Sequence, residues 1–158
     1  MSVELTPKGT YGARMPKFPP PLGWLFWNLF SLGARLRGSH LLDLTTVGAH
    51  TGRRHTHQLS WFPAGKGTDE AWLIVASWGG SRQHPDWYFN MARNPAKVWI
   101  RIGPRTWHVW PESLKGAERD ETFQRIVAVS PGYAAYQKRT DRVIPVIRLK
   151  PIKEEMEK

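Results

Sequence analysis

Two glycine turns, each close to residues that could bind an anion, are the parts of this sequence best suited to chemistry. In the first, the apolar run Ala71–Ala76 predicts a buried strand that stops at Gly79-Gly80. Pro85 suits the first turn of a following helix, which Asn94-Pro95 would end about three turns later. A turn with exposed backbone N–H groups beside a helix N-terminus could hold a flat, anionic ligand. The same residues could equally form a connection packed on a core.

The second turn, Gly48 to Gly52, is followed by a dense basic cluster before a strand predicted at Gln58–Phe62. The cluster consists of Arg53, Arg54, His55 and His57. If the glycine turn brings these residues near Gly79-Gly80, they would form an anion site; the alternative is a solvated basic surface. The histidines, including His50, lack a nearby carboxylate, a cysteine and a helical i, i+4 spacing, so we expect no metal site.

Length and composition limit the number of domains, the cross-links and the partners that this chain can have. The chain has 158 residues, enough for one domain with a core, and no cysteine, which excludes disulfides and favours the cytoplasm. A net charge of +10 predicts an anionic partner or surface: nucleic acid, anionic lipid, or a phosphorylated or polycarboxylate cofactor. Because the basic residues are scattered, we expect no nucleic acid among the partners.

The N-terminal part is predicted to be a flexible, extended arm over residues 1–21 and an amphipathic helix over residues 22–38. Leu22–Leu36 carries apolar residues at helical spacing and a narrow polar strip. This helix is too short to span a bilayer, and no cleavage site for a signal peptide follows it. Trp24 and Trp27 would suit a helix on an anionic membrane surface. The alternative is a helix that caps a barrel end or forms a dimer interface.

The remaining pattern predicts a mainly β domain with inserted helices over residues 39–152, followed by a charged tail over residues 153–158. Further strands are predicted at Leu41–Val47, Val98–Ile102, Thr106–Trp110 and Ile144–Leu149. A helix should run from an N-cap at Ser113 to Val129, and a shorter one after Pro131 should carry Tyr133, Tyr136 and Thr140 on one side. Because alternating βαβ units are missing, about six strands favour a closed antiparallel barrel.

Three separated motifs resemble those of the deazaflavin-dependent nitroreductase family. They are TTVGAHTG at Thr45–Gly52, ASWGG followed by HPDWYFNMARNP, and PGYAAYQKRTDRVIP at Pro131–Pro145, within a likeness that covers Leu41 to Pro151. The resemblance implies a split antiparallel β-barrel, related to the FMN-binding, pyridoxamine-phosphate-oxidase-like fold. It also implies coenzyme F-420, an 8-hydroxy-5-deazaflavin, whose reduced form delivers a hydride to quinones, nitroaromatics or activated alkenes.

The resemblance also implies site residues. Ser77, Gly79, Gly80, Trp87 and Asn90 would line the deazaflavin and its ribityl-phosphate side. Family members often have cations where this chain has Ala49, His50, His55 and Trp78, so Arg53, Arg54 and Arg82 would supply the positive charge. Tyr133 and Tyr136 would shape the acceptor pocket, and Ser130, in place of a frequent tyrosine, would widen it. As a phenol, Tyr133 could donate a hydrogen bond to the developing oxyanion of the acceptor.

These expectations combine into an F-420-dependent reductase of a bulky, lipophilic acceptor. We expect it to be cytoplasmic, with peripheral contact to the inner face of the membrane through residues 22–36, and an actinobacterial source follows from the family's coenzyme. Split barrels of this type often pair, so a homodimer is also expected. The second hypothesis is a non-catalytic barrel protein with an altered ligand, such as FMN, haem or a lipid.

Overall fold

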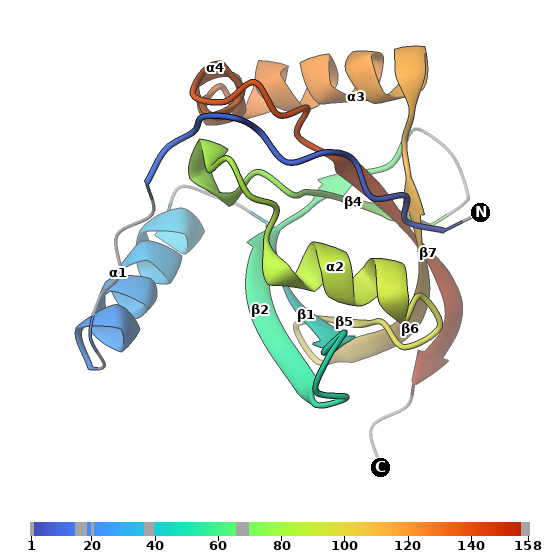
Figure 1. Cartoon of the computed structure of the whole chain (residues 1–158). Helices are drawn as coiled ribbons and strands as arrows, with labels where there is room; N and C mark the ends of the chain where they lie inside the picture. Colours follow the sequence, from blue (N-terminus) through green and yellow to red (C-terminus); the bar gives the residue numbers. More distant parts are fainter. Residues whose placement is uncertain (1, 15–18, 20, 37–39, 66–69, 156–158) are drawn as a thin grey trace.

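In the computed structural model, which describes residues 2–14, 19, 21–36, 40–65 and 70–155, the chain folds into one curled antiparallel sheet (Figure 1). The strand order is β2-β1-β5-β6-β7-β4-β3. The strands are β1 (Leu41–Val47), β2 (Arg54–Ser60), β3 (Phe62–Pro63), β4 (Trp72–Val75), β5 (Trp99–Ile102), β6 (Arg105–Ser113) and β7 (Val146–Glu155). Although β2 and β3 lie at opposite edges of this order, only Trp61 separates them along the chain, and β2 also contacts β4. The curled sheet therefore returns on itself, as the predicted split barrel requires.

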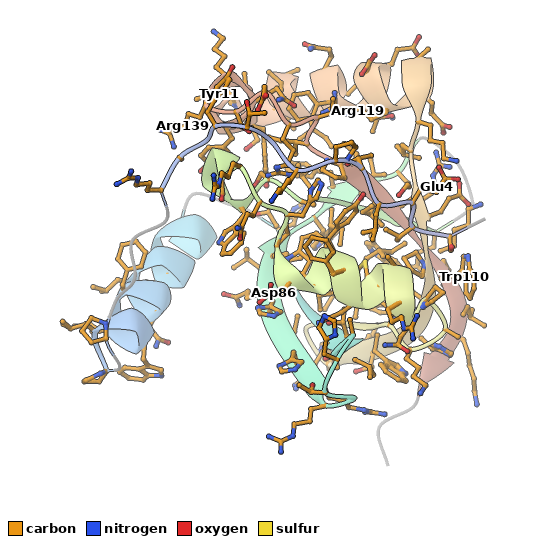
Figure 2. The ribbon with its side chains drawn as sticks, viewed as in Figure 1. Glu4, Tyr11, Asp86, Trp110, Arg119 and Arg139 are labelled. Carbon is orange, nitrogen blue, oxygen red and sulfur yellow. The ribbon has the colours of Figure 1, made fainter. Side chains whose placement is uncertain are left out.

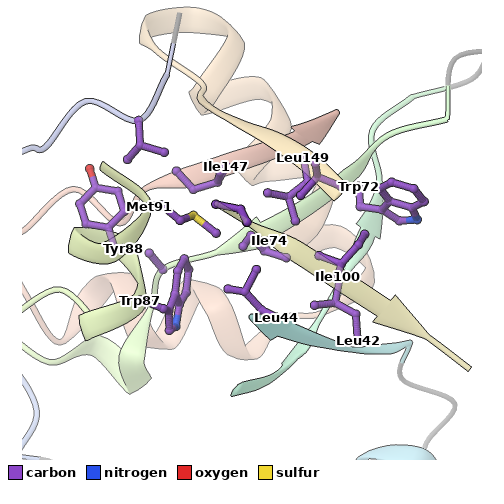
Figure 3. Packing of buried hydrophobic residues seen from close by; sticks show 14 of the residues in the cluster. Leu42, Leu44, Trp72, Ile74, Trp87, Tyr88, Met91, Ile100, Ile147 and Leu149 are labelled. Carbon is purple, nitrogen blue, oxygen red and sulfur yellow. The ribbon is translucent and has the colours of Figure 1, made fainter. Parts of the chain in front are cut away.

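Side-chain alternation gives the sheet two apolar faces. Leu44, Ile74 and Ile147 point into the barrel, while Leu73 and Val75 belong to a second cluster on the outer face. The strands of the inner cluster meet a helix, α2 (Asp86–Arg93), which contributes Trp87, Tyr88 and Met91 (Figure 3). Because β4 is covered on both faces, all four of its residues are buried.

Three further helices complete the fold. The helices α3 (Gly116–Val129) and α4 (Gly132–Lys138) lie together over one end of the barrel, and Phe123 and Ile126 of α3 pack into the outer cluster (Figure 1). The helix α1 (Leu22–Leu36) stands beside the barrel with large apolar side chains exposed, among them Trp24 and Leu29. The expected helix is confirmed over these residues, and its last two expected positions, 37 and 38, lie outside the described residues.

Several predicted boundaries were wrong, and pairing explains most of them. β2 begins at Arg54 because it pairs with β1 along its whole length, from Leu41 opposite Ser60 to Val47 opposite Arg54. Ser113 pairs with Ile147 at the end of β6, so Lys115 is the N-cap of α3. The same β6–β7 ladder continues to residues 154 and 155. Part of the predicted charged tail is thus strand, and residues 156–158 lie outside the described residues.

Residues 2–14 are extended, as predicted, but they pack against the barrel and are not a loose arm. Val3 is buried in the inner cluster, and the Tyr88 hydroxyl donates a 2.6 Å hydrogen bond to the Glu4 carbonyl. The Thr10 backbone N–H donates to the Asp141 carboxylate at 2.8 Å. The segment is therefore part of the fold; residues 1, 15–18 and 20 of the predicted arm lie outside the described residues.

Candidate active site

The turn η1 (Trp78–Gly80) has an unusual backbone, closed by a 2.9 Å hydrogen bond from the Gly80 N–H to the Ser77 carbonyl. Trp78, Gly79 and Gly80 all have positive φ, at 37°, 61° and 82°, after Ser77 in the right-handed helical region. A right-handed residue followed by a left-handed one directs successive N–H groups to one side, a concave arrangement that binds anions. Trp78, with 37% of its surface exposed, stands on the same turn. The turn thus offers an anion-binding backbone and an accessible aromatic ring.

Gly80 lets α4 approach this turn. A Cβ on Gly80 would lie 2.5 Å from the carbonyl oxygen of Tyr136, which is closer than any real side chain comes. Arg139, at the end of α4, donates a 3.3 Å hydrogen bond to the Gly79 carbonyl. The structure therefore brings together Gly79, Gly80 and Tyr136, three of the predicted site residues.

The two tyrosines of α4 form one aromatic cluster with β3. The rings of Tyr133 and Tyr136 meet edge to face at 5.7 Å, and Tyr133 meets Phe62 in the same way. Tyr133 is also hydrogen-bonded to the side chain of Ser60, and burial raises its pKa to about 12. Its phenol is consequently neutral at any working pH, a hydrogen-bond donor and not a base. Ser130 links the helices α3 and α4, because its carbonyl accepts a 3.3 Å hydrogen bond from the Tyr133 N–H.

Asn90 holds the second glycine turn against α2. Its Oδ1 accepts from the Ala49 N–H at 3.0 Å, and its Nδ2 donates to Thr46 Oγ1 at 3.1 Å. Asn94 adds a 3.2 Å bond to the Val47 carbonyl. Since Asn90 is only 7% exposed and both ends of its amide are used, it positions the turn that carries His50. That Asn90 also contacts the coenzyme stays a prediction.

Strand alternation divides the predicted basic cluster between two faces. His55 and His57 stand opposite Thr46 and Leu44 on the inner face, whereas the Arg54 guanidinium lies 4.3 Å over the ring of Trp99 on the other face. The expectation that the whole cluster approaches Gly79-Gly80 is therefore wrong for Arg54. Arg53 lies exposed at the tip of the hairpin, where its backbone N–H donates a hydrogen bond to the Thr51 hydroxyl.

His57, on β2, interacts electrostatically with Asp86 at the start of α2. Desolvation and the nearby His55 lower the pKa of His57, while the Asp86 carboxylate opposes this shift. The ring of His55 lies against the second turn, since a Cβ on Gly48 would be 3.1 Å from its Nε2. The second turn meets the C-terminal half of α2 through Asn90 and Asn94, whereas five residues separate the end of η1 from the start of α2, so the two glycine turns lie at different places along this segment. A ligand that contacts both turns must be elongated.

Trp87 packs in the core. Only 4% of its surface is exposed, and Figure 3 shows its ring beside Leu44, within the inner cluster. The helical spacing of Trp87 and Met91 thus marks the buried face of α2. Trp78 is the tryptophan of this region that a ligand can reach.

Sequence reasoning missed Arg142 and His84, which lie under the turn. Arg142 is 2% exposed and donates to the carbonyl oxygens of Ala76, Ser77 and Ser81 at 2.9, 2.9 and 3.0 Å. It also donates to Nδ1 of His84 at 2.9 Å. Burial lowers the pKa of Arg142 to about 10, so the guanidinium is still charged at neutral pH. Both residues stand in motifs that carried the family resemblance, His84 in HPDWYFNMARNP and Arg142 in PGYAAYQKRTDRVIP, but no local pattern marked them as supports of the turn.

Comparison with known proteins gives a consistent result. The model of a family described as F420H(2)-dependent quinone reductase matches residues 28–151. The chain is 35% identical, over 124 residues, to an F420H(2)-dependent quinone reductase of Mycobacterium tuberculosis. The aligned region covers 75% of this chain and 78% of that protein.

Solved structures agree with the sequence comparison. The structure of an F420-H2 dependent reductase, FDR-A, has 33% identity and a TM-score of 0.59, over 70% of this chain and 93% of that one. A second, described as a domain-swapped dimer, has 30% identity and a TM-score of 0.59, over 82% and 99%. A Listeria innocua protein of the pyridoxamine 5'-phosphate oxidase type, at 14% identity and a TM-score of 0.51 over 80% and 94%, shares the fold alone.

Proposed function

This chain belongs to the F420H(2)-dependent quinone reductase family, and from that premise we propose that it is an oxidoreductase that transfers a hydride from the reduced coenzyme to a quinone. The resemblance to deazaflavin-dependent reductases is thereby confirmed. Of the three acceptor classes expected from the sequence, quinones agree with the family. The non-catalytic alternative, with FMN, haem or a lipid as ligand, has no comparable support.

The observation that carries the proposal is the contact between η1 and α4. A hydride transfer needs a donor and an acceptor held face to face with water excluded. The backbone of Ser77–Gly79 is suited to an anionic group of the coenzyme, and the exposed ring of Trp78 is suited to a flat one. Tyr136 lies directly beside this turn. The bound coenzyme would supply the hydride, and the protein would supply the geometry.

Charge along α2 supports an elongated, anionic coenzyme. His55 and His57 lie on the inner face of β2, and Arg53 is exposed at the tip of the hairpin. The Arg53 guanidinium would attract phosphate and carboxylate groups, and the imidazole N–H groups could donate hydrogen bonds to them. We therefore place the coenzyme along β2 and α2, with its ring end at η1. His50, on the hairpin tip with Arg53, would reach its polar end.

The tyrosines of α4 would act on the acceptor. As a quinone gains a hydride, negative charge develops on its carbonyl oxygen, and a neutral phenol stabilises that oxygen by donating a hydrogen bond. Tyr133 is neutral, but it is bonded to Ser60 and packed on Phe62. We propose Tyr136, whose backbone carbonyl adjoins the turn, as the donor. We assign Tyr133 and Ser130 to the wall that shapes the acceptor pocket.

We also propose that α1 places the enzyme on the cytoplasmic face of a membrane, where lipid-soluble quinones are found. Its exposed apolar side chains include Trp24, Leu25 and Leu29, and the chain carries a charge of +10. No helix in the described part of the chain is long and apolar enough to cross a bilayer. Replacing Leu25 and Leu29 with serine should abolish sedimentation with anionic vesicles and leave reduction of a water-soluble quinone unchanged. Loss of a dimer instead would assign α1 to an interface between copies.

A titration with coenzyme F-420 and, separately, with FMN tests the central proposal. The coenzyme should quench tryptophan fluorescence, the quenching should largely disappear in Trp78→Phe, and it should persist in Trp87→Phe because Trp87 is buried. Quinone should then oxidise the reduced coenzyme in a protein-dependent reaction. Tight binding of FMN alone, or no quinone-dependent oxidation, would refute the assignment.

Assembly is a separate proposal. One related structure is described as a domain-swapped dimer. We propose that this protein also forms a homodimer, which light scattering at two concentrations would test. A monomer at both concentrations would rule the dimer out.

A further inference from the structure

Arg142 connects the two sides of the coenzyme-binding turn. Ala76 and Ser77 precede the turn and Ser81 follows it, and all three carbonyl oxygens accept hydrogen bonds from this one guanidinium. A guanidinium has five N–H donors in a rigid plane, whereas a lysine has three on one flexible nitrogen. Burying a cation among carbonyls without a carboxylate partner is costly unless its hydrogen bonds are well made. The turn's unusual backbone is therefore coupled to Arg142.

His84 is held in one neutral form. Because Nη1 of Arg142 can only donate, Nδ1 of His84 must accept, and the ring proton must sit on Nε2. That nitrogen donates to the Thr6 carbonyl at 2.8 Å. A second proton would set an N–H of the histidine against an N–H of Arg142. Burial lowers the pKa of His84, the charge of Arg142 lowers it further, and the Thr6 carbonyl opposes both.

Thr6 belongs to a segment, residues 4–13, that we call the N-terminal strap. This strap crosses the turn. Gly9 donates to the Arg82 carbonyl at 2.7 Å, and Ala13 donates to the Gly80 carbonyl at 2.9 Å. A Cβ on Gly12 would lie 2.2 Å from the Arg82 nitrogen, so the strap and the turn touch backbone to backbone. Figure 1 shows the strap running past α4 and across the segment that carries η1.

The other side of the strap is tied to the segment that ends in Arg142. The Thr10 hydroxyl donates to Asp141 at 2.6 Å, and the Thr140 hydroxyl donates to the Tyr11 carbonyl at 2.8 Å. Figure 2 labels Tyr11 on the strap and Arg139 at the end of α4, where the strap passes this helix. The strap thus joins the two segments that Arg142 also joins.

We propose that Arg142, His84 and the N-terminal strap are positioning elements that hold the Trp78–Gly80 turn in its coenzyme-binding form, and that protonation of His84 releases them. The proposal rests on the proposed function for the identity of the ligand. Its direct consequence is that affinity for the coenzyme depends on pH through a residue that does not touch the coenzyme.

Within this cluster, His84 is the group that titrates near neutral pH, as its neighbours show. On α2, the ring of Tyr88 lies 4.6 Å away with its hydroxyl bonded to Glu4, and Phe89 lies at 5.9 Å. From the C-terminal segment Arg142 faces it, and from the strap the Thr6 carbonyl does. Burial raises the pKa of Tyr88, so it does not ionise near neutrality.

The sign of the pH effect follows from the lowered pKa of His84. A released histidine titrates near pH 6.5, whereas the docked one resists protonation. The docked strap is thus fully stable above about pH 6.5. It loses stability as the pH falls below that value toward the lower pKa of the docked ring.

Two measurements on the full-length protein test this. Hydrogen exchange without coenzyme, corrected for the intrinsic pH dependence, follows the Gly9 and Ala13 amides, and a fluorescence titration gives the dissociation constant of coenzyme F-420. From about pH 7.5 to 5.5 we expect the wild-type amides to lose protection and the dissociation constant to rise about fivefold or more. His84→Asn keeps an acceptor for Arg142 but cannot titrate, so its strap protection should not change with pH.

Arg142→Lys should lose strap protection and bind the coenzyme about tenfold or more weakly at both pH values. Arg148→Lys, on β7 and paired with Glu112 and Glu118 instead of with the turn, is the matched control and should change neither. Unchanged strap protection in Arg142→Lys, or equal pH dependence in His84→Asn and wild type, would overturn the proposal. If the wild type binds no coenzyme at all, the proposed function fails, while hydrogen exchange still decides whether the strap is held.

Discussion

Gly80→Ala should lower the free energy of unfolding by more than the strain of a positive φ at alanine alone. Gly80 has a φ of 82°, and the new methyl group would lie 2.5 Å from the Tyr136 carbonyl oxygen and 3.0 Å from the Arg139 Cβ. The first contact is with backbone, so α4 as a whole must move. The substitution thus tests the contact on which the proposed active site depends.

The expected loss in the free energy of unfolding has two parts. A left-handed alanine costs about 1 kcal/mol relative to glycine. The clash with α4 adds about 1–3 kcal/mol, as overpacking does elsewhere. Together they give a loss of about 2–4 kcal/mol in the free energy of unfolding. For a chain of this size, that lowers Tm by roughly 5–15 °C.

Gly103→Ala is the matched control, because Gly103 has a φ of 58° and no atom within 4 Å of the added Cβ. It carries the backbone penalty without the clash, so its Tm should fall by roughly 2–4 °C. Thermal unfolding of both variants, with a coenzyme titration of each, completes the assay. Only Gly80→Ala should weaken coenzyme binding. Equal destabilisation of the two variants would mean that α4 does not press on the turn, and the reasoning would fail.

Three other changes separate parts of the site. Arg54→Ala should leave the coenzyme dissociation constant within about twofold, because Arg54 stacks on Trp99 on the outer face; a larger loss in the titration would place Arg54 in the site. Tyr133→Phe removes a buried hydroxyl and should cost about 1 kcal/mol in urea unfolding. Since the pKa of Tyr133 is about 12, quinone reduction by the wild type should show no inflection from this residue between pH 7 and 9; an inflection that disappears in the variant would contradict this. The Thr10 hydrogen bonds lower the pKa of Asp141, so its stabilisation is present above the ordinary aspartate pKa and is lost as the pH falls through the lowered value. The stability difference between wild type and Asp141→Asn should accordingly shrink in acid; a constant difference down to pH 2 would refute it.

Local patterns were enough to determine many elements of this protein. The apolar spacing of Leu22–Leu36, the Leu and Thr content of Leu41–Val47 and the proline signals around Asp86–Arg93 predicted those elements at or near their observed bounds. Helical and strand periods, and the turn preferences of glycine and proline, act over a few neighbouring residues. The separated motifs also led to the family and, through it, to the split barrel.

Only the tertiary structure decided which side chains face the site. Pairing with β1 placed Arg54 on the outer face, and the packing of α2 on the sheet buried its residue Trp87 in the inner cluster. Arg142 meets carbonyl oxygens more than 60 residues earlier in the chain, and His84 meets Thr6 at a similar separation. Such contacts depend on register and on which segments the fold brings together, and no local period encodes either. The residues that support the turn were therefore visible only once the chain was folded.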